Sequence, residues 1–317
     1  MAVAACPDNA ASGAVEPETK AVAELRFSDL DEIDKLGEGA CGEVTKVRLR
    51  GSSAEFALKI AYYDNNDPEG EMEVLRRVAQ SGSPYIVGCH ATFRGPADEP
   101  AMLLELMDAG SLSRVVRSRG GHGLPEPALA EVAARCLAGL VHLHSRGVAH
   151  LDLKPDNILA NSRGDVKICD FSVSRIFLSP DGESRRISIS VGAPEYLSPE
   201  GFKPNAHAGP RGACAADVWS LGITVMKLFL GDTPILPADV RSSWVKIKEA
   251  ILYGEPPSFP ESSSASAELR GFVTSCLQKN PKQRSTVAQL LAHPFVARRD
   301  VEASRHQLRE IIVETMQ

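Results

Sequence analysis

The run from His150 to Asn157 (HLDLKPDN) concentrates polar side chains that could do chemistry on a phosphate. Asp152 can take a proton from a hydroxyl group, Lys154 can neutralise a phosphate, and Asn157 can hold a magnesium ion. Asp170 follows thirteen residues after Asn157, behind a short apolar segment, where it can bind the metal ion that bridges two phosphates. These residue types at this spacing indicate transfer of a phosphoryl group to a hydroxyl.

A glycine-rich segment lies upstream, at residues 37–44 (GEGACGEV), and fits the pattern G-x-G-x-x-G-x-V. Its glycines let the backbone approach a phosphate closely. A dinucleotide-binding loop shares the glycine spacing, and a plain hairpin turn is a second alternative. The residues on both sides alternate as strands do, whereas a dinucleotide loop lies between a strand and a helix. We therefore interpret the segment as a phosphate-binding loop.

A lysine and a glutamate follow this loop at positions that suit phosphate binding. Ala57 and Lys59 share one face of an expected strand, so Lys59 can reach the α and β phosphates while Ala57 lies over the base. Glu71 is our choice for the carboxylate that pairs with Lys59, because it lies on the apolar face of the helix expected next. Glu69 and Glu73 on the same helix are the alternatives.

The segments that must position these groups divide into two regions. Residues 33–60 alternate between apolar and polar positions with glycines between them, as antiparallel strands do. Further strands are expected at 86–93 and 101–106, and one helix at 69–79. Long helical patterns then follow at 127–145, 215–230, 243–253, 267–278 and 286–291. A small β-rich region before a large α-rich region is an α+β order, with a hinge expected at 107–110.

The composition is that of an ordinary globular chain of 317 residues with a formal net charge of −6. This charge gives no reason to expect nucleic acid or an anionic membrane as a partner. The seven cysteines are scattered without a CxxC pair, which favours reduced thiols in an intracellular compartment. No signal peptide is expected, and the apolar stretch 218–230 reads as a buried helix because it is too short for a bilayer.

Taken together and in this order, these motifs resemble those of a eukaryotic protein kinase, over residues 30–295. The resemblance extends to Glu200, Asp217 and Arg284, and it implies that Asp217 holds the backbone of the catalytic run while Arg284 pairs with Glu200. It also implies a two-lobed fold, with a small antiparallel sheet and one regulatory helix in the first lobe, and ATP and Mg as cofactors. The expected divisions are a flexible leader at 1–27, a kinase domain at 28–297 (N-lobe 28–107, C-lobe 108–297) and a helical tail at 298–317.

The same resemblance assigns the catalytic roles and the nucleotide contacts. Lys59, held by Glu71, would orient the phosphates. Asp152 would orient the acceptor hydroxyl, and Lys154 would stabilise charge on the phosphoryl group in transit. Magnesium would be held by Asn157 and by the aspartate at 170. The nucleotide would contact Leu36, Gly37, Glu38, Gly39, Ala40, Cys41, Gly42, Glu43, Val44, Ala57, Lys59, Leu104 at the back of the pocket, Glu105 and Met107 through hinge backbone groups, and Leu159 below the adenine.

Finer features are similar to the mitogen-activated protein kinase kinases of plants. They are the segments 83–87 (SPYIV), 107–112 (MDAGSL), 254–257 (GEPP) and 290–295 (LLAHPF). This resemblance implies a dual-specificity enzyme that phosphorylates threonine and tyrosine in the activation loop of a downstream MAP kinase. It further implies a monomer in the cytoplasm, with the nucleus as a second compartment. An upstream kinase would act on Ser184, Ser188 or Ser190.

Three residues depart from the family pattern and keep other functions open. Leu151 replaces the arginine that grips an activation-loop phosphate. Ser172 replaces the glycine after Asp-Phe, where a positive φ would strain serine, and Ala193 replaces a threonine whose hydroxyl faces the substrate. The alternatives are a nucleotide-binding pseudokinase or scaffold with weak activity, and an ordinary Ser/Thr kinase elsewhere in the cascade. The tail reads as an amphipathic helix that closes on the large lobe, with a partner-binding helix as the alternative.

Overall fold

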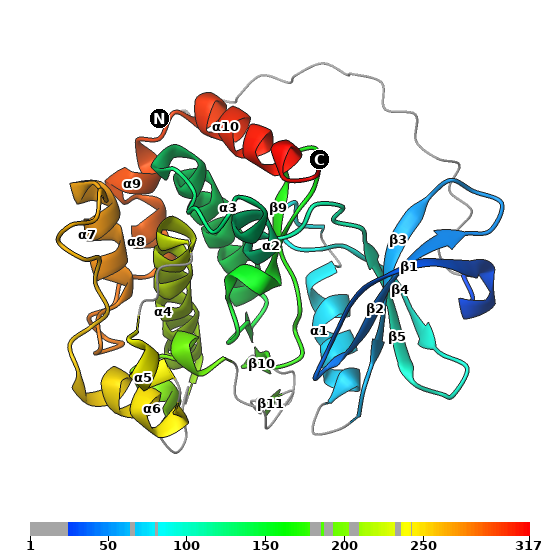
Figure 1. The fold of residues 1–317 in the computed structure, drawn as a ribbon. Helices are drawn as coiled ribbons and strands as arrows, with labels where there is room; N and C mark the ends of the chain where they lie inside the picture. The colour runs from blue at the N-terminus through cyan, green and yellow to red at the C-terminus, as the bar shows by residue number, and fades with distance from the viewer. Residues whose placement is uncertain are drawn as a thin grey trace, which may run out of the picture.

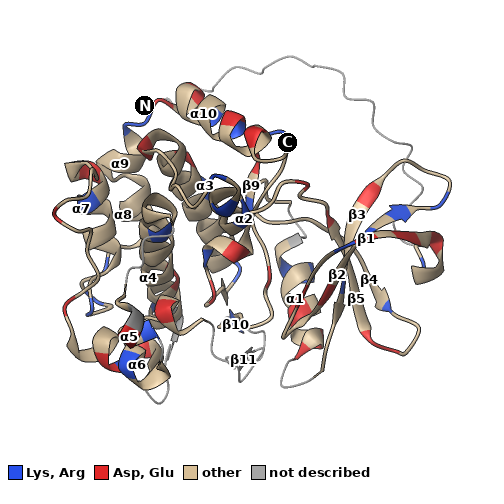
Figure 2. Ribbon diagram, viewed as in Figure 1, with Lys and Arg blue, Asp and Glu red and all other residues tan. Residues whose placement is uncertain are grey.

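The computed structural model describes residues 25–63, 67–79, 82–177, 185–186, 193–202, 209–231, 236–241 and 243–317. The described chain forms two lobes, a sheet lobe followed by a helical lobe (Figure 1). The predicted α+β order, with a small sheet lobe before a large helical lobe, is confirmed. Figure 2 shows acidic and basic residues interspersed over both lobes in this view.

The first lobe is a five-stranded antiparallel sheet with one helix. Its strands are ordered β1-β2-β3-β5-β4. The helix, α1 (Pro68–Ala79), packs against the sheet through its apolar face, with Met72, Leu75 and Val78 buried. The strands are β1 (Leu30–Gly39), β2 (Gly42–Leu49), β3 (Glu55–Ala61), β4 (Cys89–Arg94) and β5 (Pro100–Glu105).

The strand predicted at 86–93 begins later, at Cys89, so that boundary was wrong. The residues before it bond to the other lobe: the amide of Val87 donates to the carbonyl of Ile168, and the amide of Ile168 donates to Tyr85, both at 2.9 Å. The apolar pattern continues across the point where the pairing changes from one lobe to the other, because the segment is buried whichever lobe it pairs with. The pattern therefore does not mark the start of the strand.

The second lobe is built around α4 (Gly209–Leu230), whose Trp219, Leu221 and Val225 are fully buried. By length and mean hydropathy (1.5) its stretch Arg211–Leu230 could cross a membrane, but 72% of that window is buried inside the lobe. Burial among other helices accounts for this apolar character, as expected for a core helix. The surrounding helices are α2 (Leu112–Ser118), α3 (Glu126–Ser145), α5 (Ala238–Arg241), α6 (Trp244–Tyr253), α7 (Ala267–Cys276), α8 (Val287–Leu291), α9 (Pro294–Ala297) and α10 (Val301–Glu314).

Short paired strands line the face of this lobe that meets the sheet lobe. They form two three-stranded sheets, ordered β6-β8-β9 and β11-β10-β7. The first sheet carries the chain from the hinge to the segment before Asp170, and the second ties the segment after Asp170 to the start of the catalytic run. The strands are β6 (Gly110–Ser111), β7 (Val148–Ala149), β8 (Ile158–Ala160), β9 (Val166–Ile168), β10 (Arg175–Ile176) and β11 (Arg185–Arg186).

The tail predicted after residue 297 contains a helix, α10, that packs along α3. Leu308 and Ile312 are fully buried there. The buried carboxylate of Glu131 on α3 accepts hydrogen bonds from Arg299 and Arg305, both at 2.9 Å, besides one from its neighbour Arg135. The tail helix therefore closes on the large lobe.

Candidate active site

Lys59 joins both lobes at the centre of the site. Its ammonium group, on β3, donates to Glu71 of α1 at 2.6 Å and to Asp170 beyond β9 at 2.9 Å. Of the three candidate glutamates, Glu71 is the one that faces Lys59, because Glu69 pairs with Arg94 and Glu73 with Arg77 instead. The structure thus brings together three charged groups that lie 12 and 111 residues apart in the chain.

Two of the three groups in this cluster, Lys59 and Asp170, are held in their ionised forms, whereas burial raises the pKa of Glu71 above its ordinary value. Burial disfavours a charged ammonium at Lys59, but the carboxylates of Asp170 and Glu71 outweigh that cost and raise the pKa of Lys59. Burial also disfavours a carboxylate at position 170, yet the nearby ammonium lowers the pKa of Asp170 well below its ordinary value. The ammonium of Lys59, which could bind phosphate, and the carboxylate of Asp170, which could bind a metal ion, are therefore both charged and lie side by side.

Both oxygens of the Asp152 carboxylate accept hydrogen bonds from the chain itself. Its Oδ2 accepts hydrogen bonds from Lys154 at 2.6 Å and from the side-chain amide of Asn157 at 2.9 Å. Its Oδ1 accepts from the backbone amide of Ala193 at 3.1 Å. The family has a threonine hydroxyl at position 193. In this chain the backbone amide of Ala193 contacts Asp152 and orients its carboxylate without a side chain.

The backbone of the catalytic run is held in place by the buried carboxylate of Asp217 on α4. One of its carboxylate oxygens accepts from the amide of Leu151 at 2.7 Å, and the other accepts from the amide of His150 at 3.0 Å and contacts His144 at 2.7 Å. These bonds hold Leu151 at a φ of 66°, a left-handed conformation that is uncommon for leucine. Asp217 holds this backbone as the resemblance implied, whereas no motif in the sequence pointed to His144.

The oxygens available for a metal ion are those that magnesium prefers. Asn157 uses its amide nitrogen for Asp152, and no group among the described residues donates a hydrogen bond to its side-chain oxygen. Asp170 presents one carboxylate oxygen to Lys59. Among the described residues no group of three or more His, Cys, Asp or Glu side chains could bind a metal by itself. A magnesium ion held by Asn157 and Asp170 would therefore take its remaining ligands from phosphate and water.

The glycine loop is the hairpin between β1 and β2, with Gly39 opposite Gly42. A side chain at Gly42 (φ 151°) would lie 2.3 Å from the carbonyl oxygen of Ile60, so only glycine fits there. A Cβ at Gly37 or at Gly39 would meet nothing within 4 Å. The open space over these two residues leaves the backbone accessible to a ligand, and a hairpin of two strands excludes the dinucleotide alternative.

The charged members of the hairpin face away from that space. Glu38 and Glu43 both pair with Lys35, at 2.6 and 2.9 Å, on the exposed side of the strands. Phosphate binding by this loop would therefore depend on the backbone amides and not on the side chains of these two glutamates. The turn residues Ala40 and Cys41 connect the strands.

The hinge uses one of its backbone groups within the protein itself. The amide of Glu105 donates to the carbonyl of Gly88 at 2.8 Å, so the backbone group that Glu105 could offer to a base is its carbonyl. The side chain of Glu105 accepts from Lys167 of β9 at 2.7 Å, which ties the hinge to the large lobe. Met107 accepts at its carbonyl from Gly110, and the described residues include no acceptor for the Met107 amide.

Apolar walls for a base are present at the other expected positions. Ala57 is buried beneath the sheet, Val44 and Leu104 are partly buried, and Leu36 is exposed at the mouth (48%). Leu159 of β8 is partly buried on the opposite lobe.

Two of the three departures now have a structural description. Leu151 packs in an apolar cluster with Ala149, Phe177, Ala213 and Ala216, so this position offers a phosphate no charge. Ser172 does not have a positive φ, and the strain expected there was wrong. The left-handed conformation falls on Asp170 instead, at φ 65°, one of three described non-glycine residues with this geometry.

The activation-segment serines at 184, 188 and 190 lie outside the described residues. Glu200 and Arg284 are described and form the expected ion pair, at 2.7 Å, with the Arg284 side chain fully buried. Arg284 also donates to the carbonyl of Ala215 at 2.6 Å, which anchors the end of the segment to α4.

The assembled cluster and the two-lobed fold are those of a phosphotransferase of the protein kinase class. The family model "Protein kinase domain" matches residues 30–296, and the chain belongs to this family. It is similar to mitogen-activated protein kinase kinase 9 of Arabidopsis thaliana, with 41% identity over 276 residues and 84% of each chain covered. It is also similar to mitogen-activated protein kinase kinase 7 of Arabidopsis thaliana (38% over 282 residues, 86% of each chain) and to mitogen-activated protein kinase kinase 1c of Physcomitrium patens (33% over 286 residues, 88% of this chain and 80% of the relative).

Proposed function

We propose that this chain is an active, dual-specificity MAP kinase kinase that uses ATP and Mg to phosphorylate the activation loop of a downstream MAP kinase. The observation that carries the proposal is the convergence of Lys59, Glu71 and Asp170 beside the Asp152–Lys154–Asn157 cluster. Similarity to plant MAP kinase kinases supports the choice of substrate class.

The roles of the groups follow from their charges and contacts. Bound magnesium would supply positive charge at the phosphate oxygens. Lys59, fixed by Glu71, holds the phosphates in place, and Asp152 orients the acceptor hydroxyl and takes up its proton. Lys154 lies 2.6 Å from Asp152 and stabilises charge on the phosphoryl group as it moves. Positioning and electrostatics supply most of the acceleration in this reaction class.

The experiment is a radiolabelled ATP assay with an inactive downstream MAP kinase as acceptor. The proposal expects label on both the threonine and the tyrosine of its activation loop, and loss of label with Asp152→Ala. Label on threonine or serine alone would instead support an ordinary Ser/Thr kinase. Binding of ATP without any transfer would overturn the proposal in favour of a pseudokinase.

The pseudokinase alternative depends on Leu151, Ser172 and Ala193. The geometry weakens it at two of these positions. Ser172 is unstrained, and the amide of Ala193 supplies a donor to Asp152. An upstream kinase acting on Ser184, Ser188 or Ser190 belongs to this proposal, as does a cytoplasmic monomer. Phosphopeptide mapping after incubation with an upstream kinase would test the acceptor sites.

A further inference from the structure

The turn between β8 and β9, residues 161–165, lies between the hinge and the tail helix. On one side, Ser162 donates from its amide and from its hydroxyl to the carboxylate of the hinge residue Asp108, both at 2.7 Å. On the other side, the backbone of Gly164 packs so closely against α10 that a Cβ at Gly164 would lie 2.8 Å from the Cβ of Arg309. Figure 1 shows β9 beside the C-terminal end of α10. The turn therefore contacts both the segment expected to bind the base and the tail helix.

The turn is stiff, because Asn161 ties its two ends together. The side-chain oxygen of Asn161 accepts from the amides of Arg163 and Asp165 at 3.1 and 2.9 Å. Its side-chain amide donates to the carboxylate of Asp165 at 3.0 Å, and its carbonyl accepts from the amide of Gly164 at 2.9 Å. Asn161 is buried, so these bonds are strengthened by a surrounding of low polarity. A displacement at one end of the turn is thus carried to the other end.

The hinge depends on this turn for part of its backbone order. The amide of Ala109 donates to the carbonyl of Ala160, the last residue of β8, at 3.2 Å. Asp108, which the two bonds from Ser162 hold, lies between Ala109 and Met107. The described residues include no acceptor for the Met107 amide, which makes it the hinge donor available to a base. A shift of the turn would therefore move this donor.

Ion pairs give the tail a second connection to the turn. Arg135 on α3 lies 3.6 Å from Asp165 and 2.8 Å from the buried carboxylate of Glu131. Glu131 also accepts from Arg299 and Arg305 of the tail. Charges of opposite sign thus alternate from the tail through α3 to the turn.

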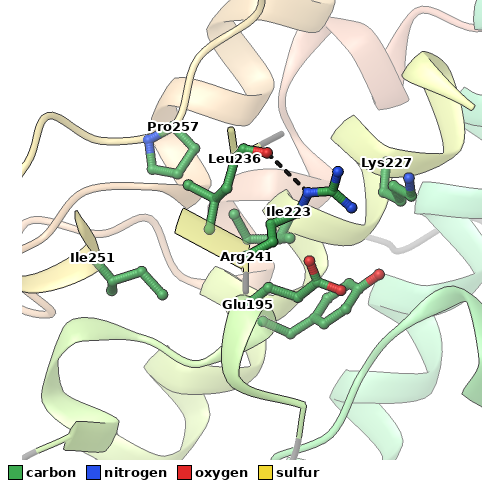
Figure 3. Close-up of a pocket in the computed structure, with 8 residues that line it drawn as sticks. Glu195, Ile223, Lys227, Leu236, Arg241, Ile251 and Pro257 are labelled. Carbon is green, nitrogen blue, oxygen red and sulfur yellow. Dashed lines mark hydrogen bonds between the residues drawn. The ribbon is translucent and has the colours of Figure 1, made fainter. Parts of the chain in front are cut away.

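This contact region is separate from the hollow of the large lobe shown in Figure 3. That hollow encloses about 510 Å³, part of it open to solvent, and its lining includes residues of the helix Pro194–Tyr196, of α4 and of α6. No residue of the hinge, of the turn 161–165 or of α10 lines it. The turn can therefore be changed without touching that surface.

We propose that the tail helix α10 positions the hinge through the turn 161–165 and thereby sets the affinity for the nucleotide. Gly164, Ser162 and Asp108 act as positioning residues, since none of them is expected to touch the base. The inference rests on the proposed function, which supplies the nucleotide, and adds a remote determinant of its binding. A hydrogen bond weakens steeply as its angle departs from the optimum, so a small shift of the Met107 amide is enough to lower the affinity.

The test is a wedge between the turn and the tail. In Gly164→Ala the new Cβ meets the Cβ and Cγ of Arg309 at 2.8 and 3.1 Å, so the turn must move. The dissociation constant of methylanthraniloyl-ATP with magnesium and the KM for ATP are expected to rise about three- to tenfold, while kcat stays within about twofold.

Gly51→Ala is the matched control for the wedge. Gly51 has a similar left-handed backbone, with a φ of 75° against 84° at Gly164, but its Cβ position has nothing within 4 Å. The two substitutions therefore introduce similar backbone strain, and only one of them pushes on the tail. Gly51→Ala should change neither constant, and an equal effect of both substitutions would contradict the proposal.

Two double variants show whether the displacement travels by the proposed route. Arg309→Gly removes the two atoms closest to the wedge, so Gly164→Ala together with Arg309→Gly should bind the nucleotide as Arg309→Gly alone does. Asp108→Ala cuts the link on the hinge side, so adding Gly164→Ala to it should have a clearly smaller effect than in wild type. Residues that share one network are non-additive in this way. Fully additive effects in either pair would overturn the proposal.

Hydrogen exchange without nucleotide separates this inference from the proposed function. The amide of Ala109 reports on the hinge, because its hydrogen bond ends at the residue before the turn. The wedge should speed exchange of residues 105–112 about three- to tenfold relative to α4 of the same protein. Faster exchange supports the coupling even if no acceptor is phosphorylated. Exchange of the hinge at the wild-type rate refutes it even if wild type is an active kinase.

Discussion

At the scale of single residues, the site depends on charges that are buried together. The side chains of Lys59 and Glu71 are only 9% and 4% exposed. Such a pair adds little net stability, but removing one partner strands the other charge in a medium of low polarity. This asymmetry explains why a lysine on a strand can serve both as a phosphate ligand and as a structural tie between lobes.

We expect Lys59→Met to reduce phosphotransfer by about 100-fold or more, because the phosphates lose their oriented cation. The same change should lower the free energy of unfolding by about 3–5 kcal/mol, because Glu71 and Asp170 lose their partner. Steady-state kinetics and urea unfolding measure the two effects.

Lys46→Met is the control for this change, since Lys46 is a β2 lysine that pairs with Glu55 near the surface. Its effect on both quantities should be small. Equal loss of activity in the two variants would contradict the role given to Lys59.

At the scale of secondary-structure elements, His144 links α3 to α4 through Asp217 at 2.7 Å. Burial disfavours the charged imidazole, but the hydrogen bonds to Asp217 and Cys214 outweigh it and raise the pKa of His144 from 6.5 to about 9. The charged form is thus stabilised by folding. The stability from this pair is complete below pH 6.5 and is lost as the pH rises through 9.

Wild type should therefore lose about 3 kcal/mol more unfolding free energy between pH 6.5 and pH 9 than His144→Gln does. Glutamine keeps a donor for Asp217 but does not titrate in this range. Urea unfolding at a series of pH values measures the difference, and other titrating groups cancel between the two proteins. Parallel curves for both proteins would show that folding does not raise the pKa of His144.

The tail helix α10 gives a second test at this scale. Leu308 is fully buried against α3, whereas Val301 on the same helix is 40% exposed. Leu308→Ala should cost about 2–5 kcal/mol of unfolding free energy, because it leaves a cavity, and Val301→Ala should cost well under 1 kcal/mol. A Leu308→Ala protein as stable as wild type would show that the helix does not stabilise the lobe and would revive the partner-binding alternative.

At the scale of the whole molecule, two lobes meet across the nucleotide site. The described contacts across it include Lys59 with Asp170 and the hinge residue Glu105 with Lys167. A ligand that contacts both lobes binds only the folded protein and so stabilises it by mass action.

MgATP at about 100 times its dissociation constant should add about 2.7 kcal/mol, which corresponds to a rise in Tm of roughly 5 °C. Differential scanning fluorimetry measures the shift. EDTA should abolish most of it, and Asp170→Asn should abolish its dependence on magnesium. A shift that is the same with and without magnesium would exclude Asp170 as a metal ligand.

Much of the architecture could be predicted from local patterns. The helices α1, α3, α6, α7, α8 and α10 were expected within a few residues, whereas α4 begins at Gly209, six residues before the predicted start at 215. Three of the five sheet strands follow the alternation of residues 33–60. The short helices α2, α5 and α9 were not expected, because a helix of four to seven residues has at most two turns and its apolar period is weak. Of the helices this short, only α8 was expected among the described residues.

The sequence by itself determined the chemistry available to this protein, since Asp152, Lys154 and Asn157 lie within six residues and a short loop must keep them together. It could not decide which distant groups join them. The tie from Lys59 to Asp170 and the ion pair of Glu200 with Arg284 depend on how whole lobes and helices pack. Packing is set by apolar surfaces summed over many residues, and no local spacing encodes it.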